Sequence, residues 1–164
     1  MKTTKAALRQ TDSAVDSLPV VRRILHPTDL ADTSVRALTL AIKLARQNHA
    51  ELLLAHALPP PTPIFEIESA ARSSAESDLE VLVDRLSDQG IRARRVLIKG
   101  ARPVPGNIAE CAKFFSADLI VMGTGSRRGL ARLLRGSIAA SVVKIAPCPV
   151  LVVPSRSRAG FPKG

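Results

Sequence analysis

The sequence predicts an α/β protein in which a parallel sheet carries helices on both faces. Short apolar runs alternate along the chain with longer segments whose apolar residues recur at helical spacing. The segments between consecutive runs are too long for hairpins and fit single-helix crossovers. The chain has no Trp or Tyr and only 4 Phe in its 164 residues, so the core must consist of Ala, Val, Leu and Ile. Such a core is typical of buried parallel strands.

Five strands are expected where the apolar runs end in turn or loop residues. They are residues 22–27, 51–58, 91–98, 119–122 and 150–153. Arginines interrupt the third run, which favours an edge position in the sheet, since charges there discourage pairing with another sheet. Prolines in segment 59–63 force an extended loop. With Phe65, this segment could form a flap over a crevice or an untethered surface loop.

Four helices are expected between the strands. They follow a cap at Asp32 or Ser34, span residues 69–89, follow a cap at Asn107, and open at Gly136-Ser137. Gly90 is expected to stop the second helix, and residues 100–106 are expected to form a loop before the third. The apolar residues expected on the buried faces are Val35, Leu38, Ile42 and Ala45; Leu79, Leu82, Val83 and Leu86; Ile108, Cys111, Ala112 and Phe115; and Ile138, Val142 and Ile145.

The length predicts one domain, at residues 21–154, between a flexible extension (1–20) and a flexible basic tail (155–164). No apolar run approaches the roughly 20 residues of a membrane span, and the N-terminal segment lacks an apolar signal core. We therefore expect a cytoplasmic protein with no membrane partner. Cys111 and Cys148 lack metal-type spacing and are expected to be small buried hydrophobes.

The segment 118–153 contains the strongest indication of a ligand. An apolar run ends at Met122, a Gly/Ser/Arg-rich loop follows at residues 123–129, and Gly136-Ser137 opens an apolar-periodic segment. A helix that starts there has free backbone N–H groups and the positive end of its dipole at its first turn, which suits a phosphate. Taken alone, Gly136-Ser137 would be an ordinary helix start with a capping serine, and the preceding loop is what favours the anion site.

A crevice between the first and fourth strands would bring Thr28-Asp29 to face this loop, because ligands of such sheets sit at the carboxyl ends of strands where the strand order reverses. Asp29 could contact a ligand there or cap the following turn. His26 and His56 are expected to be structural, because nothing supplies a nucleophile and an orienting carboxylate for them. No catalytic residue and no metal-ligand set is predicted.

The net charge of +10 requires consideration of nucleic acid as a partner. Apart from the tail, two basic clusters stand out: Arg92, Arg94, Arg95, Lys99 and Arg102; and Arg127, Arg128, Arg132 and Arg135. Nucleic acid is not favoured, because no aromatic residues are interleaved with the basic ones and no nucleic-acid-binding motif is present. The second cluster falls within the predicted anion loop, where it could instead serve a triphosphate. A solvated helical face is the other interpretation of that cluster.

Three stretches of the chain resemble the universal stress protein (UspA-like) family from about Arg22 to Pro154. They are ILHPTDLADTSVRAL, LLAHA, and DLIVMGT followed by GL, RLL, GS and APCPVLVV in order. The resemblance implies a Rossmann-like, doubly wound sheet of strand order 3-2-1-4-5. It also implies a homodimer formed through the last strand (Val150–Val153), and ATP, accompanied by Mg²⁺, as ligand.

The family's loop motif is Gly, two residues, Gly, nine residues, Gly, then Ser or Thr. Here Gly123, Gly136 and Ser137 match, and Ser126 replaces the second glycine. The nucleotide-binding residues that the resemblance implies are Pro27, Asp29 and Ala57 on the adenine side, and Gly123, Ser126, Arg127, Gly129, Gly136, Ser137 and Ile138 on the phosphate side.

Ser126 is expected to weaken ATP binding without abolishing it. A non-glycine residue at positive φ costs about 1–3 kcal/mol, which is at most roughly a hundredfold in affinity. The neighbouring Gly125 could take over the unusual backbone conformation, and the serine hydroxyl can donate to a phosphate.

We therefore expect an ATP-binding stress sensor or regulator that is at most a slow ATPase. Two alternatives are a nucleotide-free protein-interaction module of the same fold, which Ser126 favours, and a basic nucleic-acid-associated stress factor, which the charge favours. The sequence does not identify the protein partners.

Overall fold

The computed structural model describes residues 20–31, 34–58, 65–99, 102–124 and 138–154. Nine elements follow one another in the chain: β1 (Arg23–Pro27), α2 (Val35–Asn48), β2 (Glu51–Ala57), α3 (Phe65–Asp88), β3 (Ala93–Ile98), α4 (Val104–Phe114), β4 (Leu119–Gly123), α5 (Ile138–Ile145) and β5 (Val150–Val153). The residues predicted to form a flexible extension and tail lie outside the described ranges, apart from Val20.

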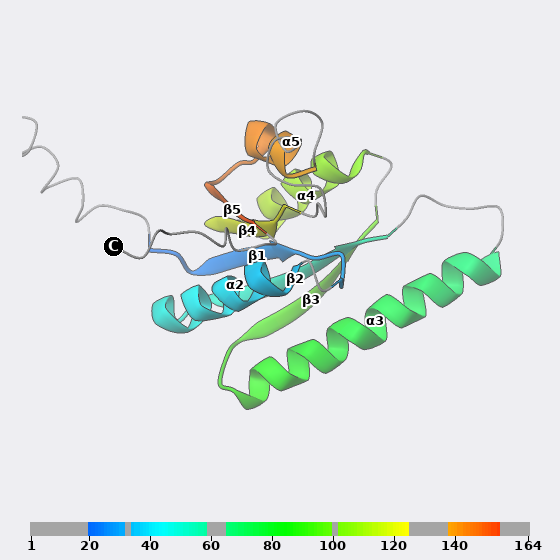
Figure 1. The fold of residues 1–164 in the computed structure, drawn as a ribbon, viewed down its shortest axis with the longest axis horizontal. Helices are drawn as coiled ribbons and strands as arrows, with labels where there is room; N and C mark the ends of the chain where they lie inside the picture. Colours follow the sequence, from blue (N-terminus) through cyan, green and yellow to red (C-terminus); the bar gives the residue numbers. More distant parts are fainter. Residues whose placement is uncertain (1–19, 32–33, 59–64, 100–101, 125–137, 155–164) are drawn as a thin grey trace, which may run out of the picture.

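The five strands form one sheet with the order β3-β2-β1-β4-β5, in which all neighbours are parallel. Figure 1 shows α2 and α3 on one face of this sheet and α4 and α5 on the other. The predicted fold class and strand order are therefore confirmed. Since the chain moves from β1 outward through β2 to β3 and then crosses to β4, the strand order reverses between β1 and β4.

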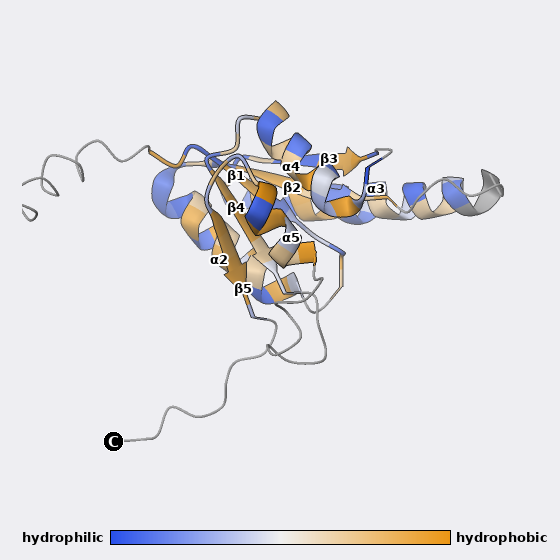
Figure 2. Cartoon of the chain, turned by 90° about the horizontal axis from the view of Figure 1, so that it is seen from above, coloured by the Kyte–Doolittle hydropathy of each residue, from blue (hydrophilic) through white to orange (hydrophobic). Residues whose placement is uncertain are grey.

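Aliphatic side chains on the two faces of the sheet form two separate cores. Leu25, Leu53 and Ile120 belong to the core under α4 and α5, whereas Ile24, Leu52 and Val121 belong to the core under α2 and α3. Adjacent residues of one strand thus enter opposite cores, as strand geometry requires. In Figure 2 the strands are largely hydrophobic and the helices carry hydrophilic segments.

Three helices end in the same way, with a backbone bond that joins a core residue to another five positions earlier. Ala50 N–H donates to Ala45 O at 2.9 Å, Ile91 N–H to Leu86 O at 2.9 Å, and Ala117 N–H to Ala112 O at 2.8 Å. This is the Schellman arrangement, with its accompanying apolar contact. The residue before each donor has positive φ: His49 (52°), Gly90 (74°) and Ser116 (49°).

The third helix begins one turn earlier than the sequence indicated. Residues 104–106 belong to α4 and not to a loop, and Pro103 is at the N-cap position. Asn107 therefore lies inside the helix, and its side-chain amide donates to Arg102 O at 2.8 Å. The reason is Pro105, because a proline in the first turn loses no helical hydrogen bond and has a suitable φ.

The buried faces of two helices differ from those predicted. Val35, Ile138 and Ile145 are 52%, 48% and 52% exposed. Alanines take the central positions instead, at Ala37, Ala41 and Ala45 in α2 and at Ala139 in α5. Their small side chains let the helix backbone lie close to the sheet, and the larger Leu38 and Ile42 pack at the margin of this stripe.

Two other helix starts also depart from the sequence interpretation. The second helix begins at Phe65 and not at residue 69. Phe65 is therefore part of a helix and not of the predicted flap. The remaining part of that flap, 59–64, lies outside the described residues. Ser34 occupies the N-cap position of α2, but its side chain makes no capping hydrogen bond. Its hydroxyl donates to Ala31 O at 2.7 Å instead, and the alternative cap, Asp32, lies outside the described residues.

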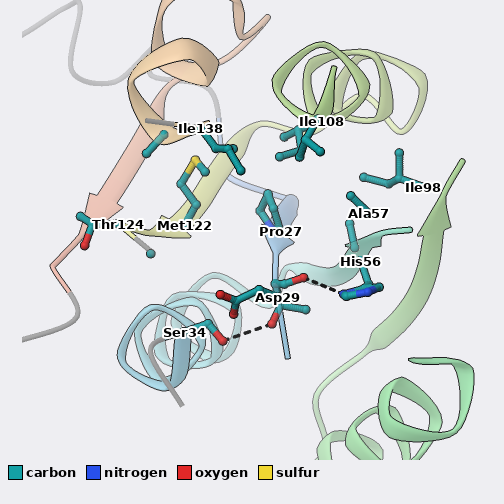
Figure 3. A pocket seen from close by; sticks show the side chains of 15 residues that line it. Pro27, Asp29, Ser34, His56, Ala57, Ile98, Ile108, Met122, Thr124 and Ile138 are labelled. Carbon is teal, nitrogen blue, oxygen red and sulfur yellow. Dashed lines mark hydrogen bonds between the residues drawn. The ribbon is translucent and has the colours of Figure 1, made fainter. Parts of the chain in front are cut away.

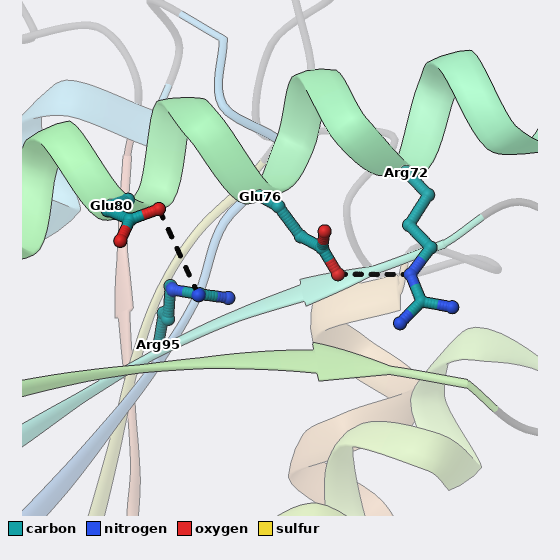
Figure 4. Close-up of polar contacts among 4 residues, drawn as sticks. All are labelled: Arg72, Glu76, Glu80 and Arg95. Carbon is teal, nitrogen blue, oxygen red and sulfur yellow. Dashed lines mark hydrogen bonds and ion pairs between the residues drawn. The ribbon is translucent and has the colours of Figure 1, made fainter.

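The strand β3 is at the edge of the sheet, as its arginines indicated, and α3 lies along it. Arg95 of β3 approaches Glu80 of α3 at 3.9 Å, and Arg72 pairs with Glu76 within α3 at 3.0 Å (Figure 4). These ion pairs are solvent-exposed, so they contribute little to stability. The attachment of α3 rests on the fully buried Leu79 and Leu86.

The pairing of β1 with β4 ends where β1 reaches a proline. The register aligns Ile24 with Leu119 and Leu25 with Ile120. One further step would have Val121 O accept the N–H of residue 27, and Pro27 has no N–H. The imidazole of His26 takes its place, because Nδ1 lies 2.7 Å from Val121 O and donates to it.

His26 is fully buried, and the contact of its Nδ1 with Val121 O gives it a structural role. Its other ring nitrogen, Nε2, has no hydrogen-bond partner among the described residues. Burial lowers the pKa of His26, although the bond to Val121 O and the nearby Asp29 carboxylate oppose this effect. The ring is therefore neutral, with its proton on Nδ1, and a second proton would have to be buried at Nε2.

We expect the protein to lose stability as the pH falls below about 6.5, the ordinary pKa of histidine. The folded state binds the proton of His26 less readily than the unfolded state does. The contribution of His26 to the free energy of unfolding is thus fully present above its pKa in the unfolded state. It is lost as the pH falls toward the lower pKa of the folded state. The slope from this one group is at most about 1.4 kcal/mol per pH unit. Urea denaturation at a series of pH values measures it.

His26→Leu should flatten this pH dependence. It should also lower the free energy of unfolding near neutral pH by about 1–3 kcal/mol, because Val121 O loses its donor. The exposed His49 provides the control, and His49→Gln should keep the wild-type pH dependence. An unchanged pH profile in His26→Leu would contradict this account.

Candidate nucleotide site

A cavity of about 390 Å³ lies at the carboxyl ends of the strands, beside the point where the strand order reverses. Such a volume is within the range of small-molecule and cofactor sites. The lining residues come from β1, β2, β3 and β4, the residue after β4, the loop after β1, and the N-terminal parts of α4 and α5. They are Pro27, Thr28, Asp29, Ser34, Ala55, His56, Ala57, Ile98, Val104, Ile108, Met122, Gly123, Thr124, Ile138 and Ala139.

One wall of the cavity is apolar. Figure 3 shows Ile108, Met122 and Ile138 on this side, with Ala57 and Ile98 continuing it. The wall exists because α4 begins at Val104, which puts its first turn beside the ends of β2 and β3. A flat apolar group such as a nucleobase ring would be desolvated against these side chains.

The opposite wall is polar and is formed by the loop after β1. Thr28 Oγ1 accepts the N–H of Leu30 at 3.0 Å and lies 3.2 Å from Ser34 Oγ. Asp29 Oδ1 accepts the N–H of Ala31 at 3.1 Å. Leu30 has a φ of 57°, a conformation that a leucine adopts only when its surroundings hold it. Short side chains therefore fix the loop that carries the Asp29 carboxylate.

His56 joins this loop to β2. Its Nδ1 donates to Thr28 O at 3.0 Å, and the ring lines the cavity (Figure 3). The backbone adds a second link, because Thr28 N–H donates to Ala55 O at 2.8 Å. The expectation that His56 is structural agrees with these contacts.

The structure brings together half of the site residues named from the sequence. Pro27, Asp29, Ala57, Gly123 and Ile138 all line the cavity. The other predicted residues lie outside the described part of the chain: Ser126, Arg127, Gly129, Gly136 and Ser137. Since α5 begins at Ile138, the positive end of its dipole points to the cavity. Asp29 also caps its own turn, so the two roles considered for it are compatible.

Sequence reasoning missed most of the apolar wall. Val104 was placed in a loop, and Ile98, Ile108 and Met122 were assigned only to strands and helix faces. The signal that could have found Val104 is Pro105, which marks the first turn of a helix. Met122 could have been found because it directly precedes Gly123 at the end of a strand.

Protein ligands for a metal ion are not gathered here. Within the described ranges, no three His, Cys, Asp or Glu side chains are close enough to hold an ion together. Mg²⁺ commonly keeps several waters and binds through phosphates with one or two carboxylates. Asp29 is the carboxylate in the lining, so the residues present fit a cation carried by a phosphate ligand better than a dedicated metal centre.

The two cysteines give no sign of reactivity. Cys111 is buried among the core residues under α4, and burial raises its pKa to about 11. Burial also raises the pKa of the half-buried Cys148, and the Asp118 carboxylate adds to this effect. Neither thiol is therefore a nucleophile at neutral pH. No helix in the described ranges combines the length and the apolar character needed to cross a bilayer.

The fold and cavity define an α/β protein with a ligand cavity at the switch point of a five-stranded parallel sheet. The sequence profile of the universal stress protein family matches residues 21–154. The universal stress protein MJ0531 of Methanocaldococcus jannaschii is 34% identical over 145 residues, which cover 80% of this chain and 81% of that protein. The chain belongs to the universal stress protein family.

Solved structures agree with this assignment. The universal stress protein UspA from Lactobacillus plantarum has the same fold, with a TM-score of 0.70, 24% identity, and coverage of 82% of this chain and 99% of that chain. A universal stress protein in complex with cAMP has a TM-score of 0.57 at 28% identity, with coverage of 84% and 100%.

The loop after β1 allows a test of how the polar wall is held. We expect Thr28→Val to lower the free energy of unfolding by about 0.5–1.5 kcal/mol, the usual worth of a hydrogen bond. Ser34→Ala should cost a similar amount, and the double variant should cost less than the sum, because the two hydroxyls interact. Urea denaturation of the four proteins measures the coupling. Strict additivity would show that this contact does not stabilise the loop.

Proposed function

We propose that this protein binds an adenine nucleotide, ATP accompanied by Mg²⁺, in the cavity between the loop after β1 and the first turns of α4 and α5. The observation that carries the proposal is the pairing of an apolar wall with the Asp29 carboxylate at the switch point of the sheet. The base is proposed to lie against the apolar wall, and Asp29 to accept hydrogen bonds from the base or the ribose.

The phosphates are proposed to lie toward Gly123 and the start of α5. Gly123 has no side chain to keep a phosphate from the backbone, and the first N–H groups of α5 favour an anion. The sequence adds Ser126, Arg127, Gly129, Gly136 and Ser137 to this side of the site. When bound, Mg²⁺ would neutralise phosphate charge. The related universal stress protein in complex with cAMP supports an adenine nucleotide as the ligand class.

A regulatory role is favoured over a fast enzyme. Of the titratable side chains in the lining, Asp29 is engaged with Ala31 N–H and His56 with Thr28 O. Neither is arranged as a general base that positions a water for attack. We propose at most slow ATP hydrolysis, with the bound nucleotide acting as a signal of cellular state. A nucleotide-free interaction module of the same fold is the second candidate, and Ser126 is the residue that favours it.

Calorimetric titration of ATP with Mg²⁺ tests the proposal, after denaturing extraction has excluded co-purified nucleotide. We expect a dissociation constant of about micromolar order in the wild type. Ala57→Leu should weaken binding at least about tenfold, because the larger side chain fills the adenine side of the cavity. Gly136→Val should also abolish or weaken binding, because a branched side chain blocks the phosphate approach.

The matched control is Ala70→Leu, the same change at an exposed position of α3. It should bind ATP like the wild type, and the thermal unfolding of all variants should be compared. Equal affinity in the wild type and Ala57→Leu would contradict the proposed place of the base. No binding by the wild type would favour the interaction module.

We also propose a homodimer that forms through β5. This strand is at the end of the sheet, and its Leu151 is 37% exposed. An apolar edge strand presents unpaired backbone groups to a second copy. The protein partners beyond this homodimer, and the cytoplasmic location expected from the sequence, stay predictions.

Light scattering at tens of micromolar should give the mass of a dimer for the wild type. Leu151→Lys should give a monomer, since a charge on an edge strand opposes strand pairing. Val81→Lys is the control, because Val81 is 49% exposed on α3, which lies along the opposite edge strand. A wild-type monomer, or a dimer unaffected by Leu151→Lys, would refute this interface.

A further inference from the structure

The amino edge of the sheet, opposite the cavity, carries an exposed aromatic side chain. Phe114 at the end of α4 is 78% exposed. Its ring packs edge-to-face on the half-buried Phe115, with centroids 5.1 Å apart and an interplanar angle of 80°. Phe115 packs against the core under α4. The Phe114 ring thus rests on Phe115, and most of its surface is open to a ligand.

Two arginines from distant parts of the chain hold this aromatic pair. The Arg94 guanidinium lies 5.6 Å from the centre of the Phe115 ring, which is within the range of a cation–π contact. Arg23 Nη1 donates to Phe115 O at 2.7 Å. Arg23 begins β1 and Arg94 lies in β3, so the fold brings the first strand, an edge strand and the end of α4 to one place.

The surface around the pair is basic. We call it the amino-edge patch, and its members are exposed residues near the first residues of β1 and β3 and the last residues of α4. They are Arg22, Arg23, Arg92, Arg94, Lys113 and Phe114.

Two carboxylates beside the patch, those of Asp118 and Glu51, are engaged by its own residues. Asp118 Oδ2 accepts the backbone N–H groups of Arg22 and Arg23 at 2.7 and 2.8 Å. The Glu51 carboxylate lies 3.5 Å from Arg94 Nη1, and its side chain is 26% exposed. The patch thus contains five cations, and the two carboxylates beside it already accept from Arg22 and Arg23 or lie against Arg94.

We propose that the amino-edge patch binds single-stranded nucleic acid, with a base stacked on Phe114 and the backbone phosphates on the surrounding arginines and Lys113. Single strands are bound by this combination of a cationic surface and an aromatic platform. A duplex keeps its bases stacked inside and could use only the charges. An acidic protein segment has no regular series of flat bases to stack on such a ring, so we expect it to bind less tightly than a single strand. The net charge of +10 assists the approach of any polyanion.

The sequence concealed this site because its parts are not contiguous. No aromatic residue lies between Arg92 and Arg102, and Phe114-Phe115 has only Lys113 beside it. Basic and aromatic side chains come to lie beside one another only where β1, β3 and α4 meet at the amino edge. The site is at the other end of the strands from the cavity, so it does not depend on nucleotide binding there.

Fluorescence anisotropy with a labelled single-stranded oligonucleotide of about 12 nucleotides, mixed in sequence, tests the proposal. We expect binding at about 50 mM salt that weakens steeply toward about 200 mM. Phe114→Ala should weaken binding by about fivefold or more, and Phe114→Tyr should bind like the wild type, because it keeps a stacking ring. Arg94→Gln should weaken binding and make the slope of log affinity against log salt shallower by about 0.7, the contribution of one phosphate contact.

The controls separate the patch from the rest of the charge. Arg36→Gln, at an exposed position of α2, should leave the affinity unchanged, and so should Ala57→Leu in the cavity. The corresponding duplex should bind more weakly than the single strand. Equal binding of the duplex, displacement by polyglutamate as effective as by unlabelled oligonucleotide, wild-type binding by Phe114→Ala, or no binding at low salt would each overturn the proposal.

Discussion

The missing N–H of Pro27 is the constraint on which the centre of this structure depends. A parallel sheet needs a donor for Val121 O at that point, and the neighbouring His26 supplies one from its side chain at 2.7 Å. This side-chain hydrogen bond keeps β1 and β4 together without a further backbone bond between them. It also ties a buried, neutral imidazole to the seam where the strand order reverses, which is where the cavity opens.

The cavity follows from this arrangement. Beyond the His26 contact, the chain after β1 turns away from β4 and is tied instead to β2, through Ala55 O and the His56 ring. The space left between Pro27 and Met122 is closed by the first turns of α4 and α5. One wall is therefore made of apolar side chains from the strand ends and from α4 and α5, and the other is a hydrogen-bonded loop. This division gives the site its apolar and polar halves.

The sequence was sufficient for the class of fold and for the strands, because five apolar runs and their crossovers leave few other arrangements. It also marked Gly90 as a helix stop, since glycine adopts positive φ readily. It could not identify His49 and Ser116 as the equivalent stops, because only the packing of the alanines around them selects that conformation. The start of α4, and with it the contribution of Val104 to the cavity, depended on the weak signal of Pro105. Phe114 became interpretable only when the fold placed arginines beside it.

The repeated helix ends have a consequence for the way the chain assembles. The contacts between Ala45 and Ala50, Leu86 and Ile91, and Ala112 and Ala117 span five positions each, so α2, α3 and α4 can each form the turn into the next strand locally. The bond between His26 and Val121 spans 95 positions and carries a far larger loop-closure entropy. Local units of a helix and the strand that follows it are thus expected to form first. The pairing of β1 with β4 is expected to form late. The ligand cavity, which lies beside these two strands, exists only after the two halves of the domain have met.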